Sequence, residues 1–163
     1  MPIISIPRKL KSKLRVPIIS IPRKLKSILV VVGWGTSLAA LTLGTMFQGL
    51  LLPNPSEILP ASYGANPLWL WLFYLGSFAV SALAAMLISD IGESIVSIFF
   101  AYGLTAFITL VVLALPDFLG IVQPSGILQQ SAILFTFNAL FPFPLLVALV
   151  GTIVGSALGE RLF

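Results

Sequence analysis

Four long stretches of this chain contain no charged residue, and they constrain its fold more than any other feature. They cover residues 28–52, 68–89, 95–115 and 133–158. Each exceeds the roughly 20 residues that an α-helix needs, at about 1.5 Å per residue, to cross about 30 Å of hydrocarbon. The alternating strands of about ten residues that build membrane barrels are missing from them. The sequence therefore predicts an all-α integral membrane protein with four transmembrane helices over these ranges.

The composition supports lipid as the solvent of this domain. Of the 163 residues, 58% are hydrophobic and only 9% are charged, whereas soluble domains carry about 25% charged residues. A soluble fold of this length could not bury so much apolar side chain, because small folds keep a large surface in water. Cysteine and histidine are both absent from the sequence, which excludes thiolate or imidazole metal sites and imidazole-dependent catalytic triads. We expect no cofactor and no bound metal.

The positive charge is confined almost entirely to the N-terminus. Eight of the nine basic residues precede the first apolar stretch, and the ninth is Arg161. The chain therefore divides into a basic arm, residues 1–27, and a transmembrane domain, residues 28–163. Basic side chains near an anionic leaflet contribute about 1 kcal/mol each, so we expect the arm to contact anionic lipid headgroups or a partner protein. No nucleic acid is expected, because the arm lacks aromatic residues that stack on bases. The arm's contact residues are Arg8, Lys9, Lys11, Lys13, Arg15, Arg23, Lys24 and Lys26.

The arm contains a repeat with a period of 15 residues. Residues 2–13 and 17–28 agree at eleven of twelve positions. Two interpretations stay open: a tandem duplication of a short coding segment, and a doubled recognition or lipid-binding element that gains avidity. The arm also has the basic, acid-free composition of an organellar transit peptide, although its prolines disfavour the amphipathic helix of such a peptide.

The orientation follows from the distribution of Lys and Arg, which favour the cytoplasmic side of a membrane. With four spans and both termini inside, all nine basic residues lie on the cytoplasmic side with Asp90, Glu93 and Glu160. The outside then carries only Glu57 and Asp117. We expect a multi-pass protein of a prokaryotic cytoplasmic membrane, with an organellar inner membrane as the alternative.

Glycines at a spacing of four residues form the most specific pattern in the sequence, of the kind called a glycine zipper. Gly151, Gly155 and Gly159 share one face of the last span, where their missing side chains allow another helix to approach closely. Ser77 and Ser81 form a weaker small-residue face in the second span, and residues 40 and 44 do so in the first. These faces predict helix packing, either within this chain or against another subunit or a second copy of the chain.

Two prolines interrupt the same last span. Pro142 cannot donate a hydrogen bond to the carbonyl of Asn138, and Pro144 likewise frees the carbonyl of Leu140. One interpretation is a kink whose polar groups are satisfied by neighbouring helices. The other is a broken helix that lines a substrate or ion site, as in some transporters. In the second case residues 145–158 are too short to span alone, and residues 127–141 form an interfacial or re-entrant segment.

These features predict a non-catalytic integral membrane subunit that packs against other membrane proteins and stabilises or positions them. Its partners are other membrane subunits or further copies of itself, and we expect no enzymatic activity. The alternative is a small oligomeric transporter or channel for a neutral or apolar solute, because the spans lack the ionisable residues of most proton and ion pathways. A lipid-modifying enzyme is the third hypothesis, and it would depend on Asp90, Glu93, Glu160 and hydroxyl groups.

Overall fold

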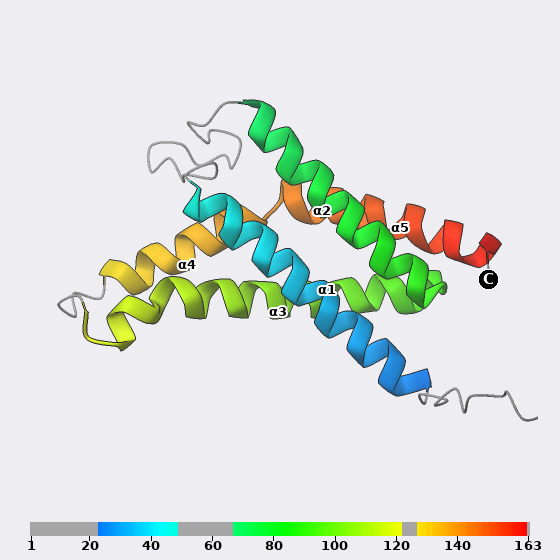
Figure 1. The fold of residues 1–163 in the computed structure, drawn as a ribbon, viewed down its shortest axis with the longest axis horizontal. Helices are drawn as coiled ribbons and strands as arrows, with labels where there is room; N and C mark the ends of the chain where they lie inside the picture. Colours follow the sequence, from blue (N-terminus) through cyan, green and yellow to red (C-terminus); the bar gives the residue numbers. More distant parts are fainter. Residues whose placement is uncertain (1–22, 49–66, 122–126, 163) are drawn as a thin grey trace, which may run out of the picture.

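The computed structural model describes residues 23–48, 67–121 and 127–162, and these ranges contain five α-helices. Four of the helices are long and apolar enough to span a membrane, and the fourth in order, α4, is shorter. The prediction of an all-helical multi-pass membrane protein with four candidate spans is therefore confirmed. The helices are α1 (Arg23–Phe47), α2 (Pro67–Ile88), α3 (Ile91–Phe118), α4 (Ile127–Leu140) and α5 (Phe143–Leu162) (Figure 1).

Two helices begin earlier than the sequence predicted. Helix α1 starts at Arg23 and therefore takes in the last basic residues that the sequence assigned to the arm. Helix α3 starts at Ile91, four residues before the predicted 95, because Asp90 caps it. The Asp90 Oδ1 atom accepts a hydrogen bond of 2.8 Å from the backbone N–H of Glu93, which satisfies one of the free donors in the first turn.

The predicted single span over residues 133–158 has the wrong bounds, because the chain divides there into two helices. Helix α4 ends at Leu140, and α5 begins at Phe143, after the turn that contains Pro142. Helix α5 then continues past the predicted end, through Glu160 and Arg161 to Leu162. It therefore has 20 residues, enough to cross a bilayer, and α4 has 14 residues, or about 21 Å.

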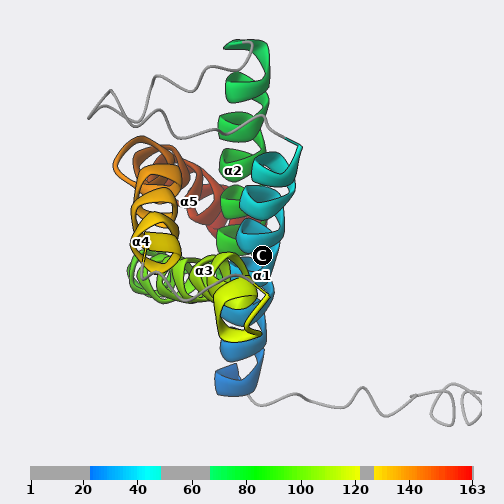
Figure 2. The ribbon, with the colours of Figure 1, turned by 90° about the vertical axis from the view of Figure 1, so that its left-hand side faces the viewer.

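The long helices run between two ends of the molecule, with α1 and α2 oblique to α3 (Figure 1). The start of α1, the turn between α2 and α3, and the C-terminal end of α5 lie at one end (Figure 1). The end of α3 and the start of α4 lie at the opposite end. Helix α4 packs beside the C-terminal half of α3, and α5 packs beside its N-terminal half, so that together they run back along α3 (Figures 1 and 2). Helix α5 makes its most extensive contact with α2.

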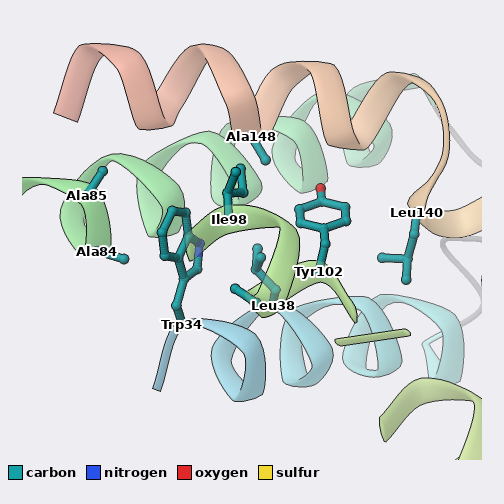
Figure 3. Packing of buried hydrophobic residues seen from close by; sticks show 9 residues of the cluster. Trp34, Leu38, Ala84, Ala85, Ile98, Tyr102, Leu140 and Ala148 are labelled. Carbon is teal, nitrogen blue, oxygen red and sulfur yellow. The ribbon is translucent and has the colours of Figure 1, made fainter. Parts of the chain in front are cut away.

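The core is small and is built mainly from modest side chains. Residues from all five helices meet in it, and Trp34 and Tyr102 are its largest members (Figure 3). Most large apolar side chains point outward instead, for example Phe100 and Leu83, which are 69% and 65% exposed. Such side chains would be buried in a water-soluble protein. Since lipid tails are as apolar as leucine, the bundle gains from close packing of small residues and leaves large residues facing lipid.

Candidate functional site

The glycine face of α5 lies directly against the backbone of α2. A Cβ atom added at Gly151 would lie 2.6 Å from the carbonyl oxygen of Phe78, and one at Gly159 would lie 2.7 Å from that of Met86. Gly155, between them, would clash in the same way with the carbonyl of Ala82. The contacts advance by four residues on both helices, so α2 and α5 run in the same direction. This face is thus occupied by the chain's own second helix.

The serines predicted on α2 are both buried. Ser77 is 2% exposed and Ser81 is fully buried. The Ser81 hydroxyl accepts a hydrogen bond of 3.2 Å from the indole N–H of Trp34 on α1, and Figure 3 shows Trp34 reaching from α1 into the core between the helices. A buried indole N–H needs such an acceptor, so this bond ties the first two helices together.

A second close approach, between α1 and α3, was not predicted from the sequence. A Cβ atom at Gly35 would lie 2.9 Å from the carbonyl oxygen of Ala101. Beside it, the Thr105 hydroxyl lies 3.0 Å from the Gly35 carbonyl oxygen and 2.8 Å from that of Ala101. Gly35 carries no partner glycine at a spacing of four, so the pattern that identified the face on α5 could not identify this one.

The break between α4 and α5 lies next to the core. The amide N–H of Phe141 donates to the Phe137 carbonyl at 2.8 Å, which closes α4, and the amide of Leu146 donates to the Pro142 carbonyl at 3.1 Å, which opens α5. The Phe141 ring meets the Tyr102 ring of α3 nearly edge-on, with centroids 6.2 Å apart. Aromatic contacts therefore hold the turn against α3. Of the other predicted residues at the break, Pro144 is buried and Asn138 is partly buried.

Two buried hydroxyl groups lie at similar heights on α3 and α4. They belong to Thr109, which is fully buried, and Thr136, which is 5% exposed. Both residues lie between two contacts that join these antiparallel helices. At one end the Tyr102 ring contacts the Phe141 ring. At the other end Gln129 Nε2 donates a hydrogen bond of 2.7 Å to an Asp117 carboxylate oxygen. Neither hydroxyl has a hydrogen-bond partner among the described residues.

A second small-residue face, on α1, is open. Its members are Gly33, Ser37, Ala40 and Gly44, spaced four, three and four residues apart, and the first three are exposed. A Cβ atom added at Gly33 or Gly44 would meet no atom of the described residues within 4 Å. The sequence had identified only the last two of these residues, because the change of spacing at Ser37 hides the continuous face.

Two cavities between α1 and α2 lie along this open face. The first, nearer the start of α1, has a volume of about 450 Å³ and is lined by Gly33 and Ser37 together with Val80, Leu83 and Leu87 of α2. The second, nearer the end of α1, has a volume of about 280 Å³ and is lined by Ala40 and Gly44 opposite Leu72 and Phe73. We call these two cavities the α1–α2 groove.

The charged residues lie near the ends of the helices. Lys26 is exposed in the second turn of α1, and Arg23 and Lys24 belong to the first turn of the same helix. The other predicted arm contacts lie outside the described residues: Arg8, Lys9, Lys11, Lys13 and Arg15. No group of three metal-ligating side chains was found within the part of the chain that the structure describes.

Comparison of the chain with protein families, with curated proteins and with solved structures finds no match.

Proposed function

We propose that this protein is a non-catalytic membrane subunit whose α1–α2 groove receives an apolar transmembrane helix of another membrane protein. The proposal rests on one contrast between two small-residue faces of the chain. The face on α5 is covered by the backbone of α2. The face on α1, of the same kind, is covered by no residue that the structure describes, since the Cβ positions at Gly33 and Gly44 have no neighbour within 4 Å among them.

Small residues on a membrane helix are useful where another backbone comes close, since they allow dense packing and weak Cα–H hydrogen bonds. Facing lipid, they gain little, because flexible acyl chains do not need a shallow surface. The α1–α2 groove is mainly apolar, with Lys26 at one end and Gln48 at the other, and leucine and valine of α2 form one wall. A partner helix with an apolar face would fill it, and a second copy of this chain is the competing occupant.

The orientation belongs to the same proposal. Both termini would lie on the cytoplasmic side, which places Lys26, Asp90 and Arg161 at one end of the bundle, as Figure 1 allows. The basic residues before α1 would then contact anionic lipid headgroups or a cytoplasmic face of the partner.

The test compares two identical substitutions. Gly33→Leu fills the α1–α2 groove, and Gly103→Leu places the same side chain on an exposed face of α3; the added Cβ meets no atom within 4 Å in either case. Both variants should therefore fold. Native mass spectrometry of the protein, extracted from its own membrane in mild detergent, should show a complex of fixed stoichiometry with unrelated subunits. We expect the wild type and Gly103→Leu to keep this complex and Gly33→Leu to lose it.

Three results would count against the proposal. A bare monomer in the wild-type extract would remove the accessory role, and a homo-oligomer would replace the foreign partner with a second copy. A complex that both leucine variants keep would show that the α1–α2 groove is not the contact.

A second candidate function is a small oligomeric transporter or channel for a neutral or apolar solute. The observation that favours it is the pair of buried hydroxyls, Thr109 and Thr136, beside the broken helix. Flux of an uncharged solute into liposomes that Asn138→Leu abolishes would support this function. Liposomes that remain tight to such solutes would argue against it.

A further inference from the structure

The N-terminal end of α1 forms a wedge with the turn between α2 and α3, and two connected cavities lie in this wedge. The first is a small polar cavity of about 110 Å³, which Lys26 and Ser27 of α1 line together with Ser89 and Glu93. The second is an apolar cavity of about 590 Å³ between α1 and α3, which shares Ser27 and Glu93 with the first. Because the two cavities share these residues, the polar cavity adjoins the apolar one.

We propose that the wedge binds a zwitterionic aminophospholipid, of the phosphatidylethanolamine type. The ammonium of Lys26 contacts the lipid phosphate, the carboxylate of Glu93 contacts the lipid ammonium, and one acyl chain occupies the cavity between α1 and α3. The apolar cavity lies on the α3 side of α1, whereas the α1–α2 groove lies on its α2 side; the polar cavity lies between them and shares Lys26, Val30 and Leu87 with the groove. Lipid binding here does not require the function proposed above.

The depth of the wedge suits a lipid headgroup. The candidate spans end at Ile88 and begin at Leu25 and Ile91, so the polar cavity lies at the boundary between hydrocarbon and headgroups. Below it, the apolar cavity is lined by Ile28, Val31, Val32, Val96 and Phe100, which are surfaces for an acyl chain.

The charges select the headgroup. Lys26 and Glu93 line the same small cavity, and yet no ion pair joins these two described residues. A headgroup with a phosphate and an ammonium supplies a partner for each of them. An anionic lipid without the ammonium would place its negative charge beside Glu93 without compensation. A choline headgroup has the right net charge, but its methylated nitrogen has no N–H to donate to the carboxylate.

The experiment measures lipid binding to the full chain by native mass spectrometry. Phosphatidylethanolamine, phosphatidylcholine and phosphatidylglycerol with identical acyl chains are added at equal concentration to the delipidated protein in mild detergent. We expect phosphatidylethanolamine to bind about tenfold more tightly than phosphatidylcholine, which is the effect of one charged hydrogen bond. Phosphatidylglycerol reports binding to the basic arm, which Glu93→Gln should leave in place.

Two variants assign the preference to the wedge. Glu93→Gln should remove the preference for ethanolamine over choline, while Lys26→Gln should weaken both lipids together. Glu160→Gln is the matched control, because this exposed carboxylate lies near the same end of the molecule and lines neither cavity. Circular dichroism checks that each variant is folded.

Equal binding of ethanolamine and choline lipids by the wild type would overturn the proposal. An ethanolamine preference that Glu93→Gln leaves intact would place the site elsewhere. If Glu93→Gln does not fold, the three-lipid series on the wild type still decides the headgroup, and Lys26→Gln decides the location.

Discussion

The close approach of α2 and α5 makes a sharp prediction about stability. Replacing Gly155 by alanine adds one methyl group where the carbonyl of Ala82 already lies. Even at Gly151, where the contact is looser, the new Cβ would lie 2.6 Å from a backbone oxygen, against 3.4 Å for the shortest ordinary contact. Neither atom belongs to a flexible side chain. The helices must therefore separate by close to an ångström.

The magnitude follows from that separation. A gap of 0.5–1 Å forfeits roughly a quarter to a half of the dispersion energy of the atoms that it parts. Methyl groups forced into well-packed interiors cost about 1–3 kcal/mol. We expect Gly155→Ala to destabilise the folded bundle by an amount in this range, and Gly155→Leu to destabilise it by more.

The control is the same substitution at Gly103, an exposed position on α3 where a Cβ meets no atom within 4 Å. There, alanine restricts the unfolded chain and favours the helix, so we expect a gain of about 0.4–1 kcal/mol. Reversible unfolding in mixed micelles, followed by circular dichroism, measures both values. Equal stability of Gly155→Ala and Gly103→Ala would refute the assigned contact between α2 and α5.

Two further predictions concern individual contacts, and a third concerns the topology. Trp34→Phe removes the hydrogen bond to Ser81 and should cost about 0.6–1 kcal/mol in the same unfolding assay; adding Ser81→Ala should then cost less than it does alone, and full additivity would contradict the bond. Asp90→Ala removes the cap of α3 and should cost about 1 kcal/mol, while Asp90→Asn should stay near wild type; equal losses would deny the capping role. The chain has no cysteine, so Glu160→Cys and Ile121→Cys each carry a single thiol. An impermeant thiol reagent should reach only Ile121→Cys from outside the cell, and labelling of both variants from one side would exclude the proposed topology.

Much of the fold could be predicted because its signals are local. Long charge-free runs identified the spans, since lipid tolerates few charged groups. The start of α3 could also have been predicted, because Asp90 followed three residues later by Glu93 resembles a capping sequence. Pro142 identified the interruption, but proline determines only where a helix stops. It does not say that α5 begins again at Phe143 and continues to Leu162.

Pairing between helices could not be predicted from spacing alone. Small-residue faces occur on α1, α2 and α5, and nothing local tells which two of them meet. The short turn at Ser89 and Asp90 forces α2 and α3 to run in opposite directions, and α5 then returns parallel to α2. Because of this connectivity, α2 packs against the glycine face of α5, and no described helix covers the small-residue face on α1. The open surface is thus a consequence of chain topology, which a local pattern does not contain.

The division between small residues at helix contacts and large residues facing lipid explains why the open face on α1 matters. In this bundle, positions where backbones meet carry Gly, Ser, Ala or Thr, as at Gly35, Ser81 and Gly155. Positions that face lipid carry Phe, Leu, Ile or Val. Gly33 and Ser37 break this division together, because both are small, exposed and part of the α1–α2 groove, whereas the exposed Gly103 stands alone between Phe99 and Phe107. In lipid, a side chain reduced to glycine forfeits contact unless a backbone replaces it. The exception therefore supports the proposal that a helix of another subunit covers this surface.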